Sequence, residues 1–197
     1  IEASDVRPSV KEQIESLGGK FIDVPYETAE EKEAAEGVGG YAKPMPASWL
    51  ERQKVEVAKR VAQADVVIST ALIPGRAAPV LITEEMVKSM KPGSVIVDMA
   101  AGKGAPNADG TVGGNCPLTE ADKIVQKHGV TIVGDTNLAA RVGADASALY
   151  ARNVLDFLKL VLPPAAKGEP ASAFRIDMED DIVAATLVAH QGAVTRR

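Results

Sequence analysis

Residues 66–100, VVISTALIPGRAAPVLITEEMVKSMKPGSVIVDMA, contain two apolar runs separated by a helix signal. The runs at 66–70 and 94–99 are continuous and rich in β-branched residues, which is typical of strands buried on both faces of a parallel sheet. Between them, Thr83 is followed by two acidic residues and predicts the start of a helix that ends near Met90. Strand, helix and strand in this order predict a right-handed βαβ unit.

The same alternation continues on both sides of this unit. Further strands are expected at 20–24 and 130–134, and further helices at about 8–17, 48–63 and 144–162. This pattern predicts the α/β class, with an open, Rossmann-like parallel sheet. The expected domain boundary divides residues 1–143, the sheet domain, from residues 144–197, a connecting helix and a C-terminal hairpin.

Three segments carry more specific expectations. Residues 27–45 are charged and then Gly-rich, without an apolar period, and are expected to form a long loop whose acidic run, 30–36, faces solvent. Ser48, with Glu51 three residues later, predicts a capping box. The alternating segments 173–179 and 182–189, separated by acidic residues, predict the hairpin.

Composition excludes several classes of function. The net charge of −5 argues against nucleic acid and against anionic membranes as partners. Cys116 is the only cysteine, so no internal disulfide forms, and with two separated histidines no metal-ligand spacing appears. No apolar run approaches the roughly 20 residues that span a bilayer. The chain begins with Ile1 and has no signal-peptide pattern, so it is expected to be a fragment or a processed product.

Residues 37–42, GVGGYA, match the spacing of the dinucleotide-binding fingerprint but lack its context. The fingerprint follows a strand directly and opens a helix, because its glycines place the pyrophosphate at the helix N-terminus. Here a charged run precedes the motif, and Pro44 and Pro46 follow it, so no helix continues from Ala42. We therefore do not interpret this stretch as a phosphate loop.

Asp5 stands at a more suitable position, between a short apolar segment and a helix that begins near Pro8. A carboxylate at such a strand end binds the adenosine ribose in dinucleotide folds, with the glycine fingerprint roughly 20 residues upstream. That fingerprint would lie before Ile1. Taken alone, this stretch favours the alternative, in which Asp5 merely starts a helix.

Other candidate contacts follow the predicted strands, where α/β folds bind their ligands. They lie at residues 70–75, which include Ala71 and Leu72, at 98–100 and at 135–138. Three strand ends at one edge would form a crevice.

Several long segments of the chain resemble one family. DVRPSVKEQIESLGGKF (5–21), GGYAK (39–43), residues 69–100, GGNCPLTE (113–120) and HGVTIVGDTNLAARVGADAS (128–147) are similar to the NAD(H)-binding domain, domain I, of the α subunit of proton-translocating NAD(P) transhydrogenase. More distantly, they resemble alanine dehydrogenase. The resemblance covers nearly the whole chain.

The resemblance implies a fold and a set of cofactor contacts. The chain would be most of the second α/β subdomain of domain I, with its first βα unit absent, and its C-terminal helix and hairpin would belong to the other subdomain. The implied NAD(H) contacts are Asp5, Val6, Arg7, Gly40 and Tyr41 in a mobile loop, Gln53, Ala71 and Leu72. Catalytic residues are expected in the region before Ile1, and no metal is implied.

The implied function is hydride transfer between NAD(H) here and NADP(H) on a partner domain, coupled to proton translocation by a membrane subunit. The chain would be active only with these partners, as a homodimer, cytoplasmic and peripheral to the inner membrane. Two alternatives remain: alanine dehydrogenase, and a truncated, non-catalytic nucleotide-binding module.

Overall fold

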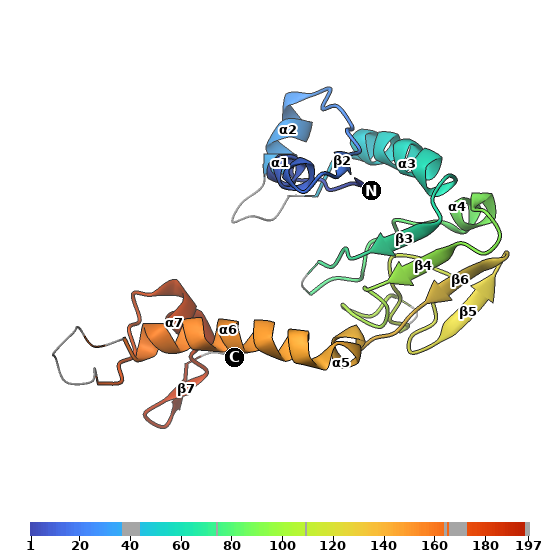
Figure 1. Cartoon of the computed structure of the whole chain (residues 1–197). Coiled ribbons are helices and arrows are strands. Elements are labelled where there is room, and N and C mark those ends of the chain that lie inside the picture. The colour runs from blue at the N-terminus through green and yellow to red at the C-terminus, as the bar shows by residue number, and fades with distance from the viewer. Residues whose placement is uncertain (37–43, 74, 109, 164, 166–172, 196–197) are drawn as a thin grey trace. The chain divides into compact units, whose positions relative to one another are not determined.

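The computed structural model describes the chain except residues 37–43, 74, 109, 164, 166–172 and 196–197 (Figure 1). The chain forms two compact units, Ile1–Thr136 and Asn137–Arg197. No helix in the described regions of the chain has both the length and the hydropathy to cross a membrane.

The first unit alternates helices and strands and contains two sheets. Strand β1 pairs with β2 in parallel, and the larger sheet has the order β3-β4-β6-β5, in which β5 alone runs antiparallel. The predicted α/β class with a parallel sheet is confirmed. In chain order the elements are β1 (Glu2–Ala3), α1 (Pro8–Ser16), β2 (Lys20–Phe21), α2 (Ala29–Glu36), α3 (Ala47–Val61), β3 (Val66–Ser69), α4 (Glu84–Ser89), β4 (Val95–Asp98), β5 (Ile124–Lys127) and β6 (Val130–Val133).

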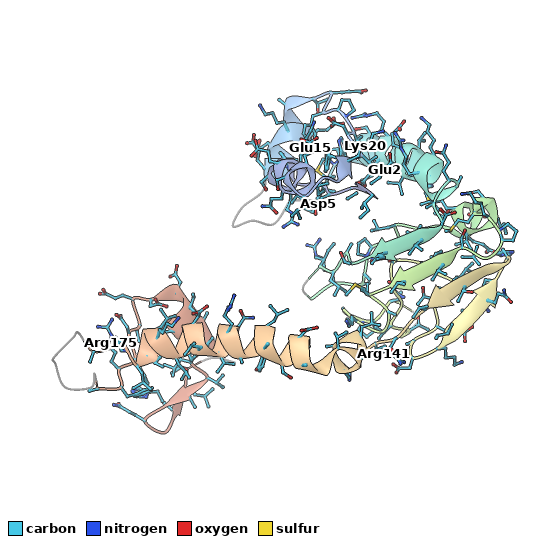
Figure 2. All side chains as sticks on the ribbon, in the orientation of Figure 1. Glu2, Asp5, Glu15, Lys20, Arg141 and Arg175 are labelled. Atoms are coloured by element: carbon cyan, nitrogen blue, oxygen red, sulfur yellow. The ribbon has the colours of Figure 1, made fainter. Side chains whose placement is uncertain are left out.

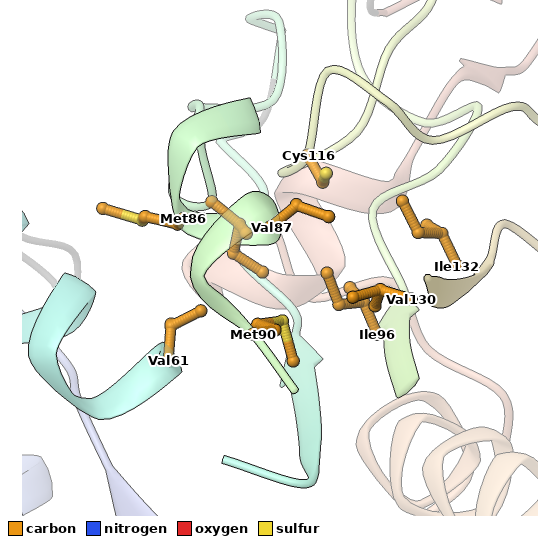
Figure 3. Close-up of a cluster of buried hydrophobic side chains, with 9 residues drawn as sticks. Val61, Met86, Val87, Met90, Ile96, Cys116, Val130 and Ile132 are labelled. Carbon is orange, nitrogen blue, oxygen red and sulfur yellow. The ribbon is translucent and has the colours of Figure 1, made fainter. Parts of the chain in front are cut away.

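One face of the larger sheet carries the core of this unit (Figure 3). The register places Val67, Ile96 and Ile132 side by side, and the last two are fully buried. Helix α4 covers them, because Thr83 accepts a hydrogen bond from the Met86 amide and starts the helix over this face. The buried cluster comprises Val61, Ile82, Met86, Val87, Met90, Ile96, Cys116, Val130 and Ile132.

The opposite face of the same sheet is apolar but open in the described structure. Val66, Ile68 and Ile124 lie on this face and are 57%, 63% and 67% exposed. The strands of the larger sheet carry apolar residues on both faces, and this is why the sequence pattern predicted burial on both faces.

Strand β5 was not predicted from the sequence. It forms a hairpin with β6 through His128 and Gly129, both with positive φ (53° and 80°). Positive φ at both loop positions is typical of a type I′ turn, whose twist matches that of paired strands. His128 also lies 2.8 Å from a carboxylate oxygen of Glu84, which joins the turn to the start of α4.

The predicted loop at residues 27–45 is partly wrong, because residues 29–36 form helix α2. Thr28 starts this helix by accepting a hydrogen bond from the Glu31 amide at 3.2 Å. The acidic run does not all face solvent, since Glu31 is buried. The predicted capping box at Ser48 is also wrong: α3 begins at Ala47, and the Ser48 hydroxyl donates to Glu31 instead.

The buried Glu31 carboxylate holds α2 against α3. It accepts hydrogen bonds from the Glu27 amide, the Ser48 hydroxyl and the Arg52 guanidinium at 2.7–2.9 Å. Burial alone would raise the pKa of Glu31, but these donors and the Arg52 charge outweigh it and lower the pKa to about 2.

The second unit is built on one long helix. Helix α6 (Gly143–Val161) follows the short α5 (Leu138–Arg141), and α7 (Asp181–Thr186) packs beside α6. The predicted strand at 182–189 is wrong over most of its length, because Asp180 accepts hydrogen bonds from two amides and starts α7 there. The hairpin is shorter and later: β7 (Ala189–His190) pairs with β8 (Ala193–Val194).

The depressed pKa of Glu31 predicts how stability depends on pH. A carboxyl with a lowered folded-state pKa stabilises the fold above its ordinary pKa of 4.5, and this contribution is lost as the pH falls toward about 2. We expect Glu31→Gln to lower the thermal unfolding midpoint at pH 7, and its difference from the unmodified protein to shrink on acidification through this range. Glu30→Gln, on the exposed side of α2, is the control. A constant difference at all pH values would contradict this role.

Candidate functional site

The carboxyl ends of β3, β4 and β6 lie at the same edge of the sheet, because these three strands run parallel. The loops that leave this edge begin at Thr70, Met99 and Gly134. Of the segments predicted to carry ligand contacts, residues 70–73, 98–100 and 135–136 lie at this edge of the first unit. The three strand ends therefore lie side by side, and ligand contacts at them stay a prediction.

Asp98, the last residue of β4, is the buried centre of this edge. Its carboxylate is fully inaccessible to solvent, and it accepts hydrogen bonds from one neighbouring strand, β3, and from the segments that follow β4. The donors are the Ala100 amide (3.1 Å), the Cys116 amide (3.0 Å), the Thr119 hydroxyl (2.8 Å) and the Ser69 hydroxyl (3.4 Å). Asp98 thus joins β3, β4 and the segment around Cys116.

The glycine before Asn115 allows this segment to approach Asp98. A β-carbon added to Gly114 would overlap with the Asp98 carboxylate, whereas one added to Gly113 would meet only the Asn107 side chain at 3.4 Å. Cys116, two residues later, is completely buried in the core. Burial raises the pKa of its thiol, and Cys116 packs in the hydrophobic cluster of this unit.

The loop after β3 is held to the same segment. The Ala71 amide donates to the Asn115 side-chain oxygen at 3.0 Å, and the Ala71 carbonyl accepts from the Asn115 side-chain nitrogen at 2.9 Å. The next residue, Leu72, is 42% exposed at the edge of the sheet.

Asp5 follows β1 and precedes α1 (labelled in Figure 2). Its carboxylate accepts hydrogen bonds from the Arg7 amide, Nε and Nη2 at 2.8, 3.0 and 2.9 Å. Partial burial would raise the pKa of Asp5, but these hydrogen bonds and the Arg7 charge hold it below its ordinary value. The side chain remains 25% exposed, so a charged carboxylate is available at this strand end.

The structure brings only some of the predicted contacts together. It joins Asp5 to Arg7, with Val6 between them. Ala71 is held instead by Asn115, which was not among the predicted contacts. Gln53 lies half-buried on α3. Among the described residues, its side chain makes no hydrogen bond to Asp5, Arg7, Ala71 or Leu72. Gly40 and Tyr41 lie outside the described residues.

Neither of two shallow surface depressions along α3 is lined by Asp5, Ala71 or Leu72. Within the described ranges, no group of three or more His, Cys, Asp or Glu side chains could hold a metal ion.

Sequence reasoning missed the role of Asn115. Nothing in the local spacing of GGNCPLTE predicts contacts with residues more than 30 positions away. The glycine pair before a polar residue was the available signal, because paired glycines often mark a close backbone approach.

Gly113 and Gly114 offer a matched test of the packing around Asp98. Gly114→Ala places a methyl group on the buried carboxylate, and we expect it to lower the free energy of unfolding by about 1–3 kcal/mol, as overpacking does. Gly113→Ala has ordinary contacts and should change stability little. Urea unfolding measures both, and equal stability of the two variants would contradict the role assigned to Gly114.

Comparison with known proteins places this arrangement in a family. The family described as "Alanine dehydrogenase/PNT, C-terminal domain" matches residues 1–197. An NAD(P) transhydrogenase α subunit polypeptide of Rhodospirillum rubrum is 49% identical over 98% of this chain and 46% of its own length. The NAD(P) transhydrogenase subunit alpha of Cereibacter sphaeroides is 43% identical over 98% of this chain and 34% of its own length. The chain thus spans less than half of either relative.

Two solved structures share the fold. The crystal structure of transhydrogenase from Sinorhizobium meliloti is similar with a TM-score of 0.67 and 40% identity, over 98% of this chain and 44% of the other. An L-alanine dehydrogenase is similar with a TM-score of 0.52 and 22% identity, over 80% and 36% of the two chains, which supports the fold alone. The chain, with Asp5 and Asp98 at its strand ends, therefore belongs to the alanine dehydrogenase/PNT C-terminal domain family.

Proposed function

We propose that this chain is the NAD(H)-binding component of a transhydrogenase α subunit. In this proposal NAD(H) bound here exchanges a hydride with NADP(H) on a separate domain, and the exchange is coupled to proton translocation. The 49% identity to a transhydrogenase α subunit over 98% of the chain supports it. The similarity to an alanine dehydrogenase structure is lower, at 22% identity, and supports only a common fold.

The observation that carries the proposal is the Asp5 carboxylate at the end of β1. An acidic side chain at this position accepts hydrogen bonds from the adenosine ribose hydroxyls in dinucleotide-binding folds. Arg7 fixes the carboxylate through its backbone amide and its guanidinium, and Asp5 keeps some of its surface exposed. Asp5 is thus charged, oriented and accessible, as a ribose acceptor must be.

The same charge favours NAD(H) over NADP(H). A 2′-phosphate on the ribose would bring a second anion to the Asp5 carboxylate, and like charges at short distance repel. The Arg7 guanidinium already donates hydrogen bonds to Asp5. It therefore does not compensate for the hydrogen bond between Asp5 and the ribose that a 2′-phosphate would remove. We therefore assign NAD(H) to this chain and NADP(H) to a partner domain.

The cofactor would supply the redox chemistry, which is hydride transfer from or to its nicotinamide. The residues of this chain bind and orient it. Asp5, Val6 and Arg7 are proposed to hold the adenosine ribose, and Ala71 and Leu72 to contact the cofactor where the chain leaves β3. Gln53, Gly40 and Tyr41 complete the proposed set of contacts.

Partners follow from the proposed reaction. We infer an NADP(H)-binding domain that receives or returns the hydride and a membrane subunit that conducts protons. A homodimer of this chain is proposed separately, from the resemblance to transhydrogenase α subunits. The protein would then be cytoplasmic and held at the inner membrane by these subunits.

The function is tested by two assays on the complete subunit. With the partner domains present, we expect NADPH to reduce an NAD analogue, and we expect no NAD-dependent oxidation of alanine. Alanine oxidation without transhydrogenation would assign the alternative enzyme. Absence of both activities with NADH binding retained in calorimetry would indicate the non-catalytic nucleotide-binding module.

Asp5→Ala tests the ribose contact directly. We expect it to weaken NADH binding by about 1–3 kcal/mol in the complete subunit, the cost of losing charge-assisted hydrogen bonds. Asp65→Ala is the control, because Asp65 also forms an ion pair, with Lys91 at 2.9 Å, but lies at the amino end of β3. NADH titrations of the two variants decide the point, and an unchanged affinity of the Asp5 variant would refute the assignment.

A further inference from the structure

The Asn115 side chain closes both ends of the loop that follows β3. It is completely buried and uses all of its polar atoms on backbone groups of this loop. The side-chain oxygen accepts from the Ala71 amide at 3.0 Å. The side-chain nitrogen donates to the Ala71 carbonyl at 2.9 Å and to the Pro79 carbonyl at 2.8 Å.

The backbone of Asn115 extends the same contact toward α4. Its carbonyl accepts from the amides of Leu81 and Ile82 at 2.9 and 3.0 Å. Ile82 belongs to the core, so the far end of the loop is fixed to packed side chains. Five hydrogen bonds from one residue thus hold the loop at its start and at its end.

Asn115 can do this because its own position is fixed. The Cys116 amide donates to Asp98 at 3.0 Å, and the Cys116 side chain lies in the core. On the other side, Gly114 packs directly on the Asp98 carboxylate. The peptide that carries Asn115 is therefore held on both sides by the end of β4.

Only an amide side chain provides this combination of groups. A planar carboxamide offers one acceptor and two donors, which matches one peptide amide and two carbonyls. A carboxylate has the same shape but has no donors, and it would face two carbonyl oxygens.

We propose that Asn115 is a positioning residue of the cofactor site, which acts by fixing the backbone at Ala71 and Leu72. This inference rests on the proposed function, because Ala71 and Leu72 are the proposed contacts after β3. Asn115 reaches the cofactor only through this backbone. A loop that is ordered before binding does not lose conformational freedom on binding. The hydrogen bonds of Asn115 should therefore increase the affinity of the site for NADH.

Asn115→Asp in the complete subunit tests the proposal through its pH dependence. At alkaline pH the buried carboxylate would repel the Ala71 and Pro79 carbonyls, and we expect NADH to bind about tenfold more weakly or worse. The variant keeps one donor, the Ala71 amide, but burial and the two facing carbonyl oxygens raise its carboxyl pKa, and the protonated acid regains one donor toward them. NADH fluorescence titrations between about pH 6 and about pH 9 should therefore show affinity returning toward that of the unmodified subunit as the pH falls.

Asn107→Asp is the matched control. Asn107 undergoes the same chemical change in the neighbouring loop, where its side chain is exposed and donates to Thr111 at 3.3 Å. We expect its affinity for NADH to follow that of the unmodified subunit at every pH.

Two results would overturn the proposal. The first is an unchanged NADH affinity in a folded Asn115→Asp variant. The second is a loss of affinity that is equal at all pH values and follows only the thermal unfolding midpoint, which indicates a structural role. If the Asp variant does not fold, Asn115→Ser, which keeps one donor without a charge, is measured instead, and unchanged affinity again refutes the proposal. Failure of the unmodified subunit to bind NADH would refute the proposed function itself.

Discussion

A buried carboxylate at the end of β4 is the constraint on which the candidate site depends. Asp98 has no access to water, and its cost of burial is met by two backbone amides and two hydroxyls. These donors come from β3 and from the loops that follow β4. One side chain therefore determines where separate regions of the sequence meet at the edge of the sheet.

The hydrophobic pattern of the sequence was sufficient for the architecture around this edge. Continuous β-branched runs predicted β3, β4 and β6, and Thr83 predicted the start of α4. Prediction from the sequence failed where side chains bind distant partners: Ser48 has the pattern of a local cap, but its hydroxyl donates to Glu31 in another helix. Glu31 itself could have been found, because Thr28 and Glu31 have the spacing of a capping box.

The second unit shows the other limit of sequence reasoning. Residues 182–189 alternate in polarity as a strand does. Asp180, just before them, accepts hydrogen bonds from two backbone amides and so stabilises the first turn of a helix instead. The true hairpin turns at Gln191 and Gly192, whose φ values of 49° and 80° suit a two-residue turn. The candidate site was less predictable than the fold, because Asn115 and Ala71 are brought together only by tertiary structure.

The burial of the chain's single cysteine beside this edge provides an internal reporter. Thiol reagents react with the thiolate, and Cys116 is inaccessible with a raised pKa, so reaction requires the surrounding structure to open. The Cys116 amide is bonded to Asp98, and the preceding residue holds the loop after β3. The rate of chemical labelling at Cys116 would therefore measure how often this edge opens, without the introduction of any probe.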